Sequence, residues 1–276
     1  YVESYQIDGV HIYRFKQQGN VIDIAWTING LAAKTSDFYS DDAMNAAIIL
    51  DRSNRAIDDA PAFITEQPIF LIWDQLLAPK LAMPSHPSCL QVNCTDTQQH
   101  YIIEDEAWRA VIVASSKAQA SLLFAGLHPH VVATPDKLNL LRKARNAVWL
   151  VENPLNDKVK LVAKKPLTLH LHKKILDYFK PSKAQKSWNS SSQLMRKEIG
   201  VSKPIAFFEH KHNKSFDQNI YISEAIDHIG SVRDMFTHFS YGGMDFKGVA
   251  KEQAYLQLSS FLLHMHARGV LFRDLS

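Results

Sequence analysis

The sequence predicts an α+β fold in which a small antiparallel β-module precedes a larger mixed region. In residues 1–80, short segments rich in β-branched and aromatic residues alternate with polar ones, a pattern typical of half-buried strands. From residue 101 onward, strand-like segments are interspersed with stretches of helical periodicity. Residues 79–100 contain Pro, Ser, Asn and Thr without a sustained period, which indicates a linker. We therefore expect a β-sandwich-like module over 1–80, a linker over 81–100 and a second domain over 101–276.

The first part is expected to be entirely β. Segments 10–15 and 21–26 alternate in hydrophobicity, and the turn Gln17-Gln18-Gly19-Asn20 between them suits a hairpin. Segments 46–51 and 69–73 continue the pattern and are predicted to be further strands.

The second part mixes both element types. We expect a strand at 107–113, a helix at 115–127, and antiparallel strands at 148–151 and 159–163. Helices are predicted near 182–199 and 249–268. The last helix presents one apolar stripe, and Gly269 provides a left-handed stop after it. The stripe consists of Ala254, Leu258, Phe261, Leu262 and Met265.

Composition excludes several classes of protein. The chain has 276 residues, with 31 Lys and Arg against 28 Asp and Glu, so no global charge indicates a nucleic-acid partner. Two cysteines, Cys89 and Cys94, exclude a disulfide framework and favour a reducing compartment. The longest apolar runs fall far short of the ~20 residues of a membrane helix. No signal peptide is visible, and we expect the chain to be an interior piece of a longer polypeptide.

The residues best suited to catalysis lie in segment 263–276. A helix ends at Gly269, an apolar pair follows, and Arg273-Asp274-Leu275 forms a turn. In a phosphoryl transferase, the Asp of such a turn orients the acceptor hydroxyl and takes its proton. The alternative is a solvated Arg-Asp pair in a polar turn, because such tripeptides also occur by chance.

With three upstream motifs, this segment resembles the lipopolysaccharide kinase family of the Kdo/WaaP type. The resemblance covers about residues 137–276, and its motifs occur in the family's order, which is more specific than any one of them. It implies a protein-kinase-like N-lobe and the start of a C-lobe. The motifs are Ser182-Lys183-Ala184 with Trp188, Leu194 with Gly200-Val201 and Pro204, the hinge Tyr221-Ile222-Ser223-Glu224, and the loop at Asp274.

The resemblance implies an ATP site. Lys164 matches the strand-borne lysine that holds the nucleotide phosphates, a role that suits a compact ammonium group. Lys165 is a rival for this role, and a solvent-facing lysine pair is the alternative. The matching hinge runs from Glu224 to Ile226, and its backbone groups would form hydrogen bonds with the adenine edge.

The same resemblance assigns catalytic roles near the end of the sequence. Asp274 matches the catalytic Asp, and Arg273 is its neighbour. The ligands of Mg²⁺ would lie beyond Ser276, so this chain alone is expected to be inactive.

The sequence departs from the family pattern at three places, and the first two departures favour a pseudokinase as the alternative, whereas the pair of Lys164 and Asp274 opposes it. Phe272 replaces the usual His of the catalytic loop, and no Gly occurs from Leu127 to Ile199 to form a phosphate-covering loop. Arg142-Lys143-Ala144-Arg145-Asn146 stands where that loop would turn, and its side chains are cationic. The magnesium ligands would lie outside the sequence.

Residues 164–203 carry ten Lys and Arg against Asp177 and Glu198. A solvated helix face is the simplest interpretation of such a run, and attraction to an anionic membrane surface is the second. Nucleic acid is not predicted, because the run lacks interleaved aromatic residues for base stacking. No metal site is predicted either, although three His-x-His pairs begin at His170, His210 and His264.

The N-terminal part is similar to the C-terminal β-sandwich of some glycoside hydrolases. Tyr13-Arg14-Phe15 matches a Tyr-x-Phe strand, and Trp26-Thr27 ends the strand that pairs with it. Asp51 and segment 67–71 fit later strands of that module, which would hold no catalytic acid. Any small antiparallel β-domain is the alternative.

The resemblance to the lipopolysaccharide kinase family implies an ATP-dependent kinase that phosphorylates a sugar hydroxyl of the lipopolysaccharide core. Its expected partners are ATP, this or another sugar acceptor, and an anionic membrane surface. The expected location is cytoplasmic, peripheral to the inner membrane, because the reaction requires ATP. The alternative is a pseudokinase, or a carbohydrate-binding or scaffolding protein whose β-module derives from a glycoside hydrolase.

Overall fold

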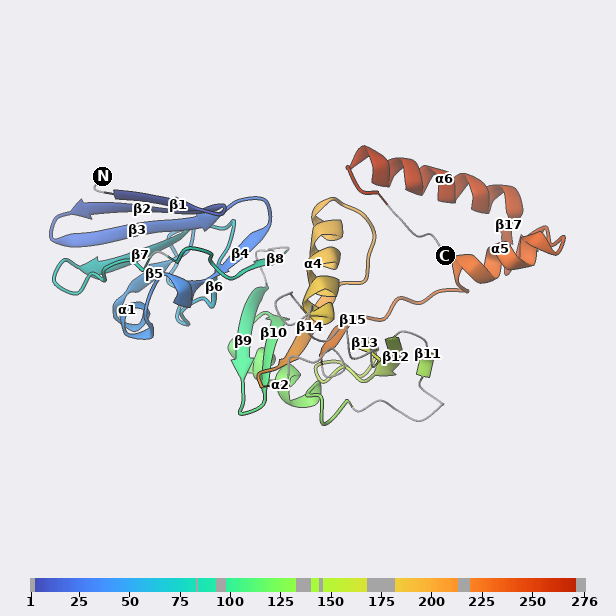
Figure 1. The fold of residues 1–276 in the computed structure, drawn as a ribbon, viewed down its shortest axis with the longest axis horizontal. Coiled ribbons are helices and arrows are strands. Elements are labelled where there is room, and N and C mark those ends of the chain that lie inside the picture. The colour runs from blue at the N-terminus through green and yellow to red at the C-terminus, as the bar shows by residue number, and fades with distance from the viewer. Residues whose placement is uncertain are drawn as a thin grey trace. The chain divides into compact units, whose positions relative to one another are not determined.

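The computed structural model describes residues 3–82, 84–92, 98–132, 140–143, 146–167, 182–212 and 219–271. The predicted α+β class is confirmed, since five α-helices accompany several antiparallel sheets in this described part (Figure 1). The chain forms two compact units. The first unit is Tyr1–Arg196 with Ser202–Ala225, and the second is Lys197–Val201 with Ile226–Ser276.

The first unit begins with a five-stranded and a three-stranded sheet, both antiparallel. The five-stranded sheet has the order β1-β2-β3-β7-β5, and the smaller sheet has the order β6-β4-β8. The elements are β1 (Glu3–Ile7), β2 (Val10–Gln17), β3 (Asn20–Thr27), β4 (Leu31–Lys34), η1 (Thr35–Asp37), α1 (Asp41–Ala46), β5 (Ile48–Leu50), β6 (Phe63–Ile64), β7 (Ile69–Asp74) and β8 (Cys89–Gln91).

The predicted hairpin is confirmed, and the fully β prediction for residues 1–80 is wrong at two places, η1 and α1. Strands β2 and β3 pair from Val10 with Thr27 to Gln17 with Asn20. The predicted strand at 46–51 is shortened to β5, because helix α1 occupies the residues before it. The Ser40 hydroxyl accepts a hydrogen bond from the Ala43 amide at 3.3 Å, which caps this short helix.

Alternation along these strands places every second side chain in the core. The strand β2 residues Val10 and Ile12 are each 1% exposed, and strand β7 contributes the buried Trp73. One ion pair lies in this interior: Asp23 is fully buried and is bound by Arg14.

The seven-stranded sheet of the first unit is entirely antiparallel and has the order β11-β12-β13-β15-β14-β10-β9. Helix α2 packs on one face, in a cluster with Ala110 and Ile112, and α4 packs on the other, in a cluster with Val111. The elements are β9 (Gln99–Glu104), β10 (Trp108–Ala114), α2 (Lys117–Gly126), β11 (Leu140–Lys143), β12 (Asn146–Val151), β13 (Leu161–Pro166), α4 (Lys183–Arg196), β14 (Pro204–His210) and β15 (Ile220–Glu224).

The segment 81–100, predicted to be a linker, contributes strand β8 to the smaller sheet. Leu90 and Val92 from this segment also lie in one apolar cluster with Trp188 of α4 and Phe207 of β14. The division of the chain into 1–80, 81–100 and 101–276 stays a prediction. The boundaries between the two compact units fall at other positions in the sequence, after Arg196, Val201 and Ala225.

The second unit contains α5 (Val232–Ser240), the hairpin of β16 (Asp245–Phe246) and β17 (Val249–Ala250), and α6 (Lys251–Ala267). Helix α5 begins with a capping box between Ser231 and Asp234. The face of α6 predicted from sequence includes its most buried residues, Ala254 and Met265, although Phe261 is 42% exposed. Gly269 takes the expected left-handed conformation, with φ of 69°. Among the described helices, none is long and apolar enough to cross a membrane.

His100 of strand β9 should make the stability of the first unit depend on pH. Burial lowers the pKa of His100 to about 4, from 6.5. The folded protein therefore holds His100 neutral above pH 4, whereas the unfolded chain binds a proton below about pH 6.5. We expect stability to fall by up to about 3 kcal/mol as the pH falls from 6.5 to 4, and no further loss from this group below that.

This expectation can be checked by urea unfolding at several pH values, comparing the protein with His100→Phe. The difference in unfolding free energy between the two proteins should change over the range from pH 6.5 to 4. A difference that stays constant over this range would show that His100 titrates normally.

Candidate functional site

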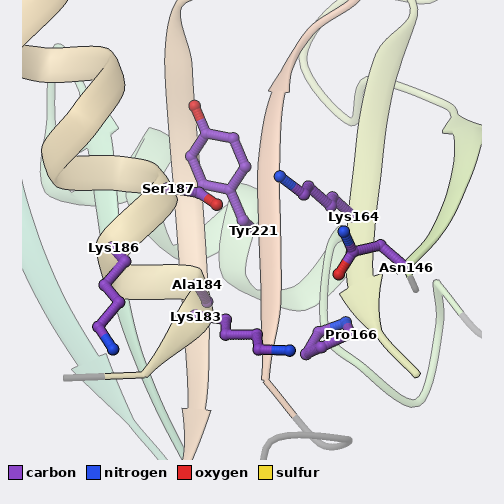
Figure 2. Close-up of a pocket in the computed structure, with 8 residues that line it drawn as sticks. All are labelled: Asn146, Lys164, Pro166, Lys183, Ala184, Lys186, Ser187 and Tyr221. Carbon is purple, nitrogen blue, oxygen red and sulfur yellow. The ribbon is translucent and has the colours of Figure 1, made fainter. Parts of the chain in front are cut away.

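A pocket of about 280 Å³ lies between the start of α4 and the sheet face that α4 covers. Strands β12, β13 and β15 form its floor (Figure 2). None of the described residues that line it is an Asp or a Glu. These residues are Asn146, Lys164, Pro166, Lys183, Ala184, Lys186, Ser187 and Tyr221.

Strand pairing decides which of the two candidate lysines faces this pocket. Lys164 lies opposite Tyr221 of β15, and Tyr221 packs in the apolar cluster that contains α4. Lys165 lies opposite Ala147 of β12, and Ala147 packs in the cluster that contains α2. Because successive side chains of a strand point to opposite faces, only Lys164 points to the α4 side.

The environment of Lys164 is unusual for a lysine. Its side chain is half-buried, and burial lowers the pKa of its ammonium group. Within the described part of the chain, the side chain of Lys164 forms no ion pair and no hydrogen bond. Buried charges are normally paired, so this group is suited to bind an anion from outside the chain.

Helix α4 adds positive charge to the pocket. Lys183 and Lys186 both lie in its first turn, and the Ser182 hydroxyl caps the helix by accepting from the Gln185 amide at 3.0 Å. Lysines are unfavourable at this end, because the helix dipole is positive there. Helix α4 contains no Asp or Glu to offset them.

Figure 2 shows how these groups are directed. Lys164 extends from β13 toward Tyr221, whereas Lys183 extends from α4 toward Pro166. Lys186 lies farther along the helix, on the side of Lys183 that is away from Pro166. Tyr221 is fixed as a wall of the pocket, because its hydroxyl donates to the Ser191 hydroxyl at 2.9 Å.

Two side chains of α4 hold the helix against strand β8. The Trp188 indole donates to the carbonyl oxygen of Gln91 at 3.0 Å, and the Asn189 side-chain oxygen accepts from the Gln91 amide at 3.1 Å. At the other end of the helix, Arg196 forms an ion pair with Glu66, which also accepts from the Gly30 amide at 2.9 Å. The position of Lys183 and Lys186 therefore depends on how the N-terminal sheets hold α4.

The predicted hinge residues do not line the pocket. Glu224 ends strand β15, and its amide donates to the Lys203 carbonyl at 2.9 Å, while the Ala225 amide donates to the Lys160 carbonyl at 3.0 Å. Ile226 is 57% exposed and is the first residue of the segment Ile226–Ser276 of the second unit. The catalytic residues predicted from sequence, Asp274 and Arg273, lie outside the described residues, as does Phe272.

The sequence did not identify Lys183, Lys186 or Asn146 as pocket residues. For Lys183 and Lys186, the available signals were the positive run over 164–203 and the lack of acidic residues from Lys183 to Arg196. For Asn146, the signal was its place in the segment 142–146, where the phosphate-covering loop would turn. The sequence could not show which of those lysines share a pocket, because that depends on how α4 packs on the sheet.

Histidines gather around Trp108 but form no metal site in the described part of the chain. The rings of His128, His130 and His210 lie 6.2, 6.5 and 4.9 Å from the Trp108 ring. Across the residues described, no three His, Cys, Asp or Glu side chains come together as a ligand set. His170 lies outside the described residues, so the pair that begins with it cannot be placed.

Comparisons with family models, with curated proteins and with solved structures gave no match.

Proposed function

We propose that this chain forms the nucleotide-binding part of an ATP-dependent phosphotransferase whose acceptor is a sugar hydroxyl. The observation that carries the proposal is Lys164, a half-buried lysine without a described partner that faces a pocket lined by further lysines. An ammonium group held on a strand is suited to bind the phosphates of ATP.

The division of the chain into compact units also supports a kinase-like arrangement. The first unit ends at Ala225 and the second resumes at Ile226, within the segment that sequence motifs predict to be the hinge. In the proposed enzyme, Asp274 would take the proton of the acceptor hydroxyl, and Arg273 would stand beside it. The lipopolysaccharide core is the proposed acceptor, reached at an anionic membrane surface on the cytoplasmic side.

The pocket does not fit a magnesium ion. Mg²⁺ prefers oxygen ligands such as carboxylates, and no described lining residue carries a carboxylate. If the phosphotransferase uses Mg²⁺, its ligands must come from residues other than these.

A pseudokinase that binds a nucleotide without transfer is the second candidate function. Protein kinases pair the strand lysine with a Glu of the neighbouring helix, and α4 offers no acidic residue. Phe272 in place of the usual His favours the same candidate.

The proposal can be tested by measuring ATP affinity by calorimetry. Lys164→Ala should weaken ATP binding about tenfold or more, because a hydrogen bond to a charged group contributes about 1.5–3 kcal/mol. Lys165→Ala removes the same charge from the opposite face of the same strand, and it should bind ATP as the unchanged protein does. If Lys164→Ala and Lys165→Ala bind ATP with equal affinity, Lys164 is not part of the ATP site.

Phosphate transfer separates the two candidate functions. In the proposed enzyme, a full-length protein that contains this chain should transfer radiolabelled γ-phosphate to a lipopolysaccharide-core acceptor in the presence of Mg²⁺. ATP binding without transfer to any of several sugar acceptors would favour the pseudokinase.

A further inference from the structure

We propose that His210 is the sensor of an acid-sensitive clasp, which holds the end of strand β14 against the turn between β9 and β10 while its imidazole is neutral. This inference concerns a different part of the seven-stranded sheet from the pocket, and it does not rest on the proposed function. The clasp consists of His210, Lys211 and His212 together with the turn residues Asp105, Glu106 and Ala107.

Three hydrogen bonds join the end of β14 to the turn. The Lys211 amide donates to the Ala107 carbonyl at 2.7 Å, and the Lys211 ammonium group donates to the Asp105 carbonyl at 3.0 Å. The third bond joins the Nε2 atom of His212 to the carbonyl oxygen of Glu106, at 3.1 Å. A carbonyl oxygen only accepts, so Nε2 of His212 carries the proton of this bond.

His210 holds the backbone of His212 in the position that the third bond requires. Its Nδ1 atom accepts a hydrogen bond from the His212 amide at 3.2 Å. A backbone amide only donates, so His210 must be neutral, with its proton on Nε2, for this bond to form. When His210 binds a second proton, Nδ1 becomes a donor, and the bond is lost whatever other contacts the ring makes.

Charged groups from several described elements surround the clasp. The Glu104 carboxylate pairs with Lys211 at 3.3 Å, and the Asp105 carboxylate accepts from two amides of the turn at 2.9 and 2.7 Å. Both carboxylates are thus bound by other donors, whereas the His212 amide needs a new acceptor in acid. The titratable and charged side chains are Lys34 of β4, Glu104, Asp105, Glu106 and Arg109 of β9, β10 and their turn, His128 and His130 after α2, and Glu209, Lys211 and His212 of β14 and the residues that follow it.

A second turn beside Trp108 has the same geometry and provides a comparison. The rings of His210 and His128 lie 4.9 and 6.2 Å from that of Trp108. In each turn, Nδ1 of the first imidazole accepts from the amide two residues later, at 3.2 Å for His210 and 3.3 Å for His128. The Asp105 carboxylate also binds Nε2 of His128 at 2.9 Å, and protonation of His128 strengthens that bond. The ring of His128 is therefore expected to stay in place in acid.

The inference predicts that acid increases hydrogen exchange at the amides of Lys211 and His212. A free imidazole binds its second proton near pH 6.5, so a conformation that opens on binding one proton becomes about tenfold more populated at pH 5.5. After correction for the intrinsic pH dependence of exchange, the exchange of these two amides should rise about tenfold between pH 7.5 and 5.5. Amides of strand β13, which lies between β12 and β15, should change much less, because they report opening of the whole unit.

Variants identify the sensor. His210→Asn places a side-chain oxygen where it can accept from the His212 amide, and this group does not titrate, so the exchange should no longer depend on pH. His128→Asn makes the same change in the matching turn and should keep the tenfold response. His212→Gln should also keep it, because its side-chain amide can still donate to the Glu106 carbonyl and His210 is unchanged.

The inference is wrong if the two amides exchange at the same corrected rate at pH 7.5 and 5.5, or if His210→Asn keeps the response. A response that His212→Gln abolishes would make His212 the sensor and would contradict the inference as well. An equal increase in the amides of β13 would show unfolding of the whole unit and would overturn the clasp. If His210→Asn does not fold by circular dichroism, the responses of the unchanged protein and of His212→Gln decide the question.

Discussion

Replacing Arg14 by Met is expected to lower the free energy of unfolding by about 3–5 kcal/mol, because it leaves a buried carboxylate without a partner. The Arg14 guanidinium donates to both oxygens of Asp23, at 2.7 and 2.8 Å, and Asp23 is fully buried. The Tyr39 hydroxyl donates to the same carboxylate at 3.0 Å. This one neutral hydrogen bond does not neutralise the carboxylate as the Arg14 cation does. Arg14 also donates to the Pro79 carbonyl at 2.9 Å, so the substitution removes a link to the end of the module.

Urea unfolding followed by tryptophan fluorescence would measure this loss. Arg55→Met provides a matched control, because Arg55 pairs with Asp51 at 2.8 Å with its side chain 73% exposed. Exposed pairs of this kind contribute under about 1 kcal/mol, so the control should change stability little. A double variant, Arg14→Met with Asp23→Leu, should recover part of the loss, since it removes the unpaired charge as well. If Arg14→Met costs no more than Arg55→Met, the interior pair is not a stabilising feature.

Local pattern predicted much of the secondary structure because its determinants are local. The hairpin of β2 and β3 follows from alternation and from a turn in which Gln18 and Gly19 both have positive φ, 50° and 84°. The end of α6 follows in the same way from Gly269. Such features require only neighbours in the sequence, so a single sequence contains the necessary information.

Elements that depend on distant partners were harder to predict. Strand β8 lies in a segment without periodicity, and it exists because its backbone pairs with β4, nearly 60 residues earlier. Helix α1 was missed for another reason. Ser40 followed by Asp41 and Asp42 is a helix-start signal, and the β-branched run that comes after it dominated the interpretation.

The same distinction between local determinants and distant partners applies to the candidate site. Lys164 could be singled out because it occurs in a strand-like segment at the position where the resemblance places a phosphate-binding lysine. That it, and not Lys165, faces the pocket required the pairing of Lys164 with Tyr221, which is a tertiary fact. Lys183 became a candidate only when α4 was seen to pack on that face of the sheet. The kinase assignment itself stays a proposal, because the loop around Asp274 lies outside the described residues.

Replacing Trp188 by Ala is expected to lower the free energy of unfolding by about 3–5 kcal/mol and to weaken ATP binding. Trp188 is fully buried, its ring lies 5.3 Å from that of Phe207, and its indole binds the Gln91 carbonyl of β8. It therefore connects helix α4 to both the N-terminal sheets and the seven-stranded sheet. Because Lys183 lies on the same helix, loss of this anchor should change the position of the pocket lysine.

The conservative variant Trp188→Phe distinguishes packing from positioning. It keeps an aromatic ring in the core and removes the hydrogen bond to Gln91, which should cost about 1–3 kcal/mol because the carbonyl loses its donor. Asn189→Ala removes the second contact with Gln91 and leaves the core intact. If α4 positions its lysines through strand β8, both variants should weaken ATP binding while the protein remains folded by circular dichroism, and hydrogen exchange in α4 should increase. Unchanged affinity in both variants, with faster exchange in α4, would show that the pocket tolerates movement of its helix and that Gln91 serves stability alone.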